Sequence, residues 1–165
     1  MHQATIPRLL LAFITALVVA TIWGSVVQSQ FNLNALAGIG ADITPGVRIT
    51  TTLADVFSGF SPTYAAYVVL PSFLVAFVVA WFISRRLPGQ TVLWFAAAGA
   101  VAVFIGNPVV NYLSPVALLV GATRDLFCLL LMALGGAVAG ALFVSVARHV
   151  PLSPRPAPSN NRIQE

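Results

Sequence analysis

Four long apolar runs constrain this chain more than any other feature of its sequence. They cover residues 9–27, 63–84, 91–112 and 124–148, and no charged side chain lies in the middle of any of them. Inside a bilayer only helices and closed barrels satisfy every backbone polar group. Because the runs are continuous and do not alternate, they predict helices, each long enough to cross a hydrocarbon core of about 30 Å. The expected fold class is an all-α membrane protein with four transmembrane helices.

The few charged residues predict the topology. Only 7% of the chain is charged, and the net charge is +4. The arginines flank the apolar runs or lie in the C-terminal tail, which suits contact with lipid headgroups and argues against a nucleic-acid partner. Counting arginines in the loops predicts that both termini are cytoplasmic. The predicted inner side holds Arg8, Arg85, Arg86, Arg148, Arg155 and Arg162, and the predicted outer side holds Arg48 and Arg124.

Local sequence signals mark the end of the first span and the start of the second. A cleaved signal peptide is the competing interpretation of residues 9–27, but no A-x-A site precedes Gln28, which favours a retained helix. Ser61 and Pro62 suit the N-cap and first helical position of the second span. Pro71 lies inside that span and predicts a kink, because proline removes one backbone hydrogen bond.

The second half of the chain has its own signals. A continuous helix from residue 115 to 149 would be about 50 Å long, too long for one untilted span. We therefore expect residues 115–122 to form a re-entrant or surface turn, with Thr123 as the N-cap of the fourth span. The proline-rich residues 150–165 are expected to form a disordered cytoplasmic tail after a single domain, residues 1–149.

Small residues on the third and fourth spans suggest close helix packing. Gly99 lies in an alanine-rich stretch, and Gly136 and Gly140 form a GxxxG motif. Glycine lets two membrane helices approach closely. The motif does not tell whether the contact is within the chain or between two copies.

The segment between the first two spans carries a helix of its own. Thr44 is a suitable N-cap, Pro45 suits the first helical position and Gly59 suits the end, so residues 45–58 are predicted to be helical. Apolar residues recur at helical spacing, with Arg48 and Asp55 on the other side. This pattern predicts an amphipathic helix lying on the membrane surface or over the outer mouth of the bundle.

Polar side chains gather on the predicted outer face, where the first and third spans end. The amide side chains at the ends of these two spans could line a pocket, or they could simply be the polar residues of helices that reach the lipid headgroups. The two asparagines of the third span could also bond to the helix backbone that Pro108 leaves without a hydrogen bond. We further expect Asp55 to pair with Arg124. The candidate cluster comprises Gln28, Gln30, Asn32, Arg48, Thr52, Asp55, Asn107, Asn111, Arg124 and Asp125.

The chemistry of most enzymes and transporters is missing from the sequence. No ionisable residue lies at the middle of a span, which argues against a proton relay. His2 and His149 are both terminal and Cys128 is the only cysteine, so no haem, metal or other cofactor site and no catalytic residue is predicted. Asp42, Asp55 and Asp125 are outer acids that could meet in space, which is a weak signal.

Several short stretches resemble a known kind of protein. QSQFNLNAL, GVRITTTL, GFSPTYA and the ATR before the last run resemble small uncharacterised four-helix inner-membrane proteins of proteobacteria. The resemblance covers about residues 9–146, and it implies the fold and a bacterial inner-membrane location. It carries over no catalytic residue, and it directs attention to Arg48, Thr52, Asp55 and Arg124.

These observations favour a non-catalytic accessory or assembly partner of other inner-membrane proteins. The first alternative is passive binding or conduction of a small apolar or lipid-like molecule that enters near Pro71, Asn107 and Asn111. The second is a membrane enzyme that uses the outer acids. Expected partners are the lipid bilayer and another membrane protein or a second copy of the chain.

Overall fold

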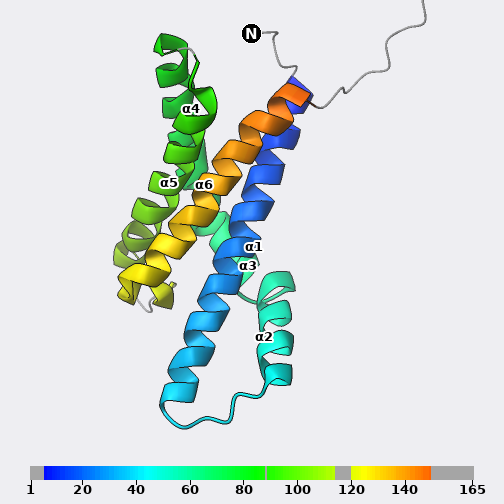
Figure 1. The fold of residues 1–165 in the computed structure, drawn as a ribbon, viewed down its shortest axis with the longest axis vertical. Coiled ribbons are helices and arrows are strands. Elements are labelled where there is room, and N and C mark those ends of the chain that lie inside the picture. The colour runs from blue at the N-terminus through cyan, green and yellow to red at the C-terminus, as the bar shows by residue number, and fades with distance from the viewer. Residues whose placement is uncertain (1–5, 88, 114–119, 150–165) are drawn as a thin grey trace, which may run out of the picture.

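The chain folds into a bundle of four long apolar helices with a shorter helix at one end (Figure 1). The computed structural model describes residues 6–87, 89–113 and 120–149, and these contain no β-strand. Four helices are long and apolar enough to cross a membrane: Ile6–Gly38, Phe60–Arg86, Thr91–Leu113 and Leu126–Arg148. The predicted all-α membrane fold is confirmed. Residues 114–119 and 150–165 lie outside the described parts, and so do most of the predicted turn at 115–122 and the predicted tail.

Helix α1, Ile6–Gly38, is much longer than its apolar run. Its 33 residues measure about 50 Å, against about 30 Å of hydrocarbon. We expected a span of 9–27 with an amide-rich segment after it, but the backbone stays helical until Gly40, where φ is +90°. Residues 28–38, here called the α1 extension, therefore stand beyond the apolar part of the bundle.

The second span is a continuous helix with a π-helical turn in it. It comprises α3 (Phe60–Tyr64), the π-helix η1 (Ala65–Val69) and α4 (Leu70–Arg86). The π-helical turn comes directly before Pro71, where the sequence predicts a kink, and the Leu70 N–H donates to the Ala65 carbonyl across it. The N-cap is Gly59, not Ser61 as expected, and the helix begins at Phe60, two residues earlier than the serine-proline signal suggests.

Helices α5 (Thr91–Leu113) and α6 (Leu126–His149) touch through their backbones. A Cβ atom on Gly136 would lie 2.2 Å from the Gly99 carbonyl oxygen, and one on Gly99 would lie 2.1 Å from the Gly136 oxygen. A Cβ atom on Gly140 would lie 2.0 Å from the Phe95 oxygen. The GxxxG motif is therefore used within the chain, and this face of α6 is covered.

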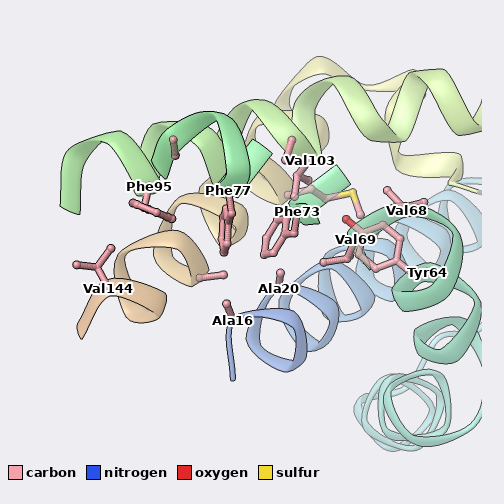
Figure 2. Packing of buried hydrophobic residues seen from close by; sticks show 14 of the residues in the cluster. Ala16, Ala20, Tyr64, Val68, Val69, Phe73, Phe77, Phe95, Val103 and Val144 are labelled. Carbon is pink, nitrogen blue, oxygen red and sulfur yellow. The ribbon is translucent and has the colours of Figure 1, made fainter. Parts of the chain in front are cut away.

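Aromatic side chains fill the centre of the bundle (Figure 2). Phe77 of α4 packs edge-on against Phe13 of α1, with ring centroids 6.1 Å apart, and lies 4.9 Å from Phe143 of α6. Phe73 stacks on Phe77, and Phe95 stacks on Phe143. Their bulk holds α4 away from α1 and α6, so α4 meets the bundle through side chains.

The start of α6 differs by two residues from the prediction. Asp125, not Thr123, caps the helix, because its Oδ1 accepts from the backbone N–H groups of Phe127 (2.7 Å) and Cys128 (3.2 Å). Thr123 lies in the 3-10 turn η2, Gly121–Arg124, and its hydroxyl donates to the Val120 carbonyl. A carboxylate accepts hydrogen bonds from the free N–H groups of a first helical turn more strongly than a hydroxyl does.

Candidate functional site

The candidate site is the contact between the α1 extension and helix α2, Pro45–Phe57. Thr44 is the N-cap, as predicted, and its hydroxyl oxygen accepts from the Val47 N–H at 3.3 Å. The helix ends at Phe57, one residue before the predicted limit. Figure 1 shows α2 running back alongside the far part of α1, roughly along the bundle's long axis. It does not lie across the end of the bundle like a lid.

Arg48 makes the broadest contact across this pair of helices. Its Nη1 donates to Gln30 Oε1 at 3.0 Å, and its Nη2 donates to Asn34 Oδ1 at 2.9 Å. The two amides are four residues apart, which places them on one face of a helix. A guanidinium presents several donors in a fixed plane, so one arginine can hold both amides at once.

Two further hydrogen bonds continue the contact toward the membrane. Gln30 Nε2 donates to Thr52 Oγ1 at 2.9 Å, and the Ser29 hydroxyl donates to Asp55 Oδ2 at 2.5 Å. Ser29 is 1% exposed, so this hydrogen bond to a carboxylate is sheltered from water on one side. These four bonds and their residues, Ser29, Gln30, Asn34, Arg48, Thr52 and Asp55, are called the interhelical network below.

The expected ion pair between Asp55 and Arg124 is absent. No salt bridge joins the two residues in the described structure; Asp55 is bonded to Ser29, and Arg124 is exposed. The physical reason is the length of α1. Because that helix continues past the membrane, its own polar face reaches Asp55 before the start of α6 can.

The polar face of α2 points toward α1, and its apolar face points away. Arg48, Thr52 and Asp55 are partly buried in the contact, and no residue of α2 is fully buried. On the opposite side Ile49 is 61% exposed, Leu53 51% and Phe57 79%. In a water-soluble protein, a surface helix turns its apolar face toward the core and its polar face toward the solvent. The apolar face of α2 is therefore without cover in the described chain.

The remaining predicted residues separate into different places. Asn111 holds the segment before α6: its Oδ1 accepts from the Val120 N–H, and its Nδ2 donates to the Val120 carbonyl and the Thr123 hydroxyl, all within 2.9 Å. Gln28 and Asn32 share a 3.4 Å hydrogen bond beside Gly121 of the same segment. The amides thus fix connections between helices.

Asn107 lies apart from these amides, inside the bundle. It is fully buried, and its Nδ2 contacts Met132 Sδ at 3.7 Å. Bonds from Asn107 and Asn111 to backbone near Pro108, one of the alternatives that the sequence left open, are not formed among the described residues, and the two asparagines have separate partners instead of lining one pocket.

A buried polar group in the bundle was not anticipated from the sequence. Ser25, Tyr64 and Asn107 come from three different helical segments and are at most 1% exposed. In the described structure the Ser25 Oγ lacks a hydrogen-bond partner, and the Tyr64 hydroxyl lies next to the Asn107 side chain. The Tyr64 ring packs directly on Gly24, where a Cβ atom would meet the ring at 2.4 Å. Helical position alone could have suggested Ser25, but the close approach of Tyr64 depends on packing.

Sequence reasoning also missed Ser29 and Trp23, and it noted Asn34 among the amides after the first apolar run without its partner. Ser29 and Asn34 lie in the interhelical network, and the i, i+4 spacing of Gln30 and Asn34 would have revealed their shared face if the helix had been continued past Val27. Trp23 Nε1 donates to the Leu131 carbonyl at 2.8 Å, and its ring packs on Gly135. These contacts fix α1 against α6.

The three aspartates that the sequence analysis singled out have different surroundings. Asp55 is bonded to Ser29, Asp125 caps α6, and Asp42 is exposed in the loop before α2. Among the residues that the structure describes, no three of the types His, Cys, Asp and Glu lie together in a way that could hold a metal ion. Comparison of the chain with protein-family models, curated proteins and solved structures found no match.

Proposed function

We propose that this protein is a non-catalytic accessory or assembly partner of other membrane proteins. The observation that carries the proposal is the outward apolar face of α2, formed by Ile49, Leu53 and Phe57. The interhelical network fixes this face in one orientation, because four hydrogen bonds hold the opposite face of the helix against α1. A fixed, exposed apolar face is typical of a surface that binds another protein.

The direction of α2 favours a protein partner over the membrane surface. A helix that binds the surface lies in the plane of the membrane, with its apolar face turned toward the lipid. Here α2 runs along α1, so its apolar side faces sideways from the bundle (Figure 1). A neighbouring membrane protein with an extramembrane part of similar height would meet this side directly.

We place this surface outside a bacterial inner membrane, with both termini cytoplasmic. The support is the distribution of arginines over the helix ends. Arg8 begins α1, Arg85 and Arg86 end α4 and Arg148 ends α6, and these three ends lie at one end of the bundle (Figure 1). The positive-inside rule makes that end the cytoplasmic one.

The proposal is tested by photo-crosslinking in the membranes of cells that make the protein. A photoreactive amino acid replaces Leu53, which is 51% exposed, or Leu130 on α6, which is 52% exposed and serves as the matched control. We expect a discrete protein adduct from position 53 that position 130 does not give, and loss of that partner in co-purification when Leu53→Ser and Phe57→Ser are combined.

Three results would refute the accessory function. They are adducts with lipid alone at position 53, the same set of proteins at both positions, or an adduct only with a second copy of the chain.

A second candidate function, binding of a small apolar or lipid-like molecule, is supported by one observation. A groove of about 520 Å³ runs between α4 and α5, and its lining includes Ser72 next to Pro71. No comparable observation supports the enzyme alternative.

A further inference from the structure

The groove between α4 and α5 follows both helices for much of the membrane thickness. Small residues from the two helices form part of its lining, and branched residues such as Val75, Val79 and Ile105 line it as well. The helices are in close contact at Gly106, where a Cβ atom would meet Ser72 Oγ at 2.3 Å. The small lining residues are Ser72, Ala76, Ala80, Ala97, Ala98, Ala102 and Gly106.

The length and the lining of the groove suit a hydrocarbon chain. The lining runs from Ser72 to Ile83 on α4 and from Trp94 to Val109 on α5, which corresponds to a length of about 20 Å at the helical rise. Apart from Ser72 and Trp94, the lining residues are aliphatic or glycine. An extended acyl chain is also long and apolar, and it can contact the small side chains along the whole groove.

One end of the groove carries positive charge. Ile83 and Trp94 line that end, and Arg85 and Arg86 follow on the last turn of α4 with both side chains exposed. Arg86 follows the lining residues Val79 and Ile83 at helical spacing, whereas the Arg85 guanidinium lies 4.5 Å from the centre of the Trp81 ring, which does not line the groove. Tryptophan and arginine at the end of a span are placed at the level of the lipid headgroups. An anionic headgroup at this height would complement Arg86 directly, and Arg85 adds positive charge nearby.

We propose that the α4–α5 groove binds one acyl chain of an anionic phospholipid, with the headgroup at the level of the last turn of α4 and next to Arg86. The lipid comes from the leaflet at the end of the bundle that holds the start of α1 and the end of α6. This site is separate from the apolar face of α2, so it stands or falls independently of the accessory function. It rests on the second candidate function, whose groove it uses, and it names the class of lipid.

The test measures lipid retained by the purified full-length protein, by native mass spectrometry. The protein in mild detergent is incubated with equal amounts of phosphatidylglycerol and phosphatidylcholine. We expect one tightly retained lipid, with phosphatidylglycerol preferred by about fivefold or more for each arginine engaged. The double variant Arg85→Gln, Arg86→Gln should retain the two lipids equally. Equal retention by the wild-type protein would overturn the headgroup assignment.

A groove-filling variant tests the position of the acyl chain. Ala97 is exposed within the groove, whereas Ala66 is exposed outside the groove lining and is the matched control. Ala97→Leu should lower retention about tenfold, because its added carbons displace the chain, and Ala66→Leu should leave retention unchanged. Gel filtration and circular dichroism verify that both variants fold. Undiminished retention in folded Ala97→Leu, or an equal loss in Ala66→Leu, would overturn the proposal.

Discussion

Replacing Gly136 by alanine should lower the free energy of unfolding by about 3 kcal/mol, because the added Cβ atom meets backbone and cannot be accommodated by a rotamer change. The Cβ atom would lie 2.2 Å from the Gly99 carbonyl oxygen and 2.8 Å from Val103 Cγ2. Relief requires α5 and α6 to separate along their length. Hydrophobic burial does not oppose this separation inside lipid, since packing itself holds membrane helices together. Thermal and denaturant unfolding in detergent measure the change.

Gly38 provides the matched control for this substitution. It is the last residue of α1, and nothing lies within 4 Å of the position its Cβ atom would take. Gly38→Ala should therefore leave stability unchanged or raise it by up to about 1 kcal/mol through helix propensity. If Gly136→Ala unfolds at the same temperature as Gly38→Ala, α5 and α6 do not touch through their backbones at Gly136.

Replacing Asp55 by alanine should expose α2 to proteolysis. Arg48 is the only basic residue between Arg8 and Arg85, so trypsin has one cleavage site between the first two spans. Cleavage there requires local unfolding of α2, and a lost hydrogen bond to a charged group costs about 1.5 kcal/mol or more. Cleavage after Arg48 should therefore be about tenfold faster in Asp55→Ala at a trypsin concentration where α2 opens and recloses many times before each cleavage. Intact-mass spectrometry of the protein in nanodiscs follows the fragments.

Asp42→Ala separates this effect from a simple change of charge. Asp42 is exposed in the loop before α2 and is also an aspartate. The variant should be cleaved at the wild-type rate. In Asp55→Ala the Ser29 hydroxyl keeps an acceptor, because the Ser25 carbonyl oxygen lies 2.9 Å away, so the loss is confined to the bond between the helices. Equal cleavage rates in the two variants would contradict the role of the interhelical network.

The sequence predicts elements well where local chemistry decides them. The four spans follow from uninterrupted apolar length, and α2 follows from Thr44 and Pro45 at its start. The extent of α1 could not be predicted in this way. Amide side chains are typical of helix ends at the lipid headgroups, and they are also tolerated inside helices. The helix ends at Gly38, the chain turns at Gly40 with a positive φ, and the amide-rich sequence before them contains no clear stop.

The orientation of α2 could not be predicted for a different reason. The amphipathic pattern gives two faces but does not say which one has a neighbour. The usual rule places the apolar face inward, and it fails here because the neighbour is the polar α1 extension. The pairing of Asp55 with Ser29, and the separation of Asn107 from the other amides, likewise depend on where distant helices lie.

The most direct test of this account is the orientation of α2 on α1, measured by disulfide formation in a Cys128→Ala background. Ser29→Cys combined with Asp55→Cys should crosslink rapidly in membranes, because the native side chains are in contact at 2.5 Å. Ser29→Cys combined with Leu53→Cys should not crosslink, since Leu53 lies on the exposed side. Efficient crosslinking of the 29–53 pair without the 29–55 pair would mean that the apolar face is turned inward and would contradict the account.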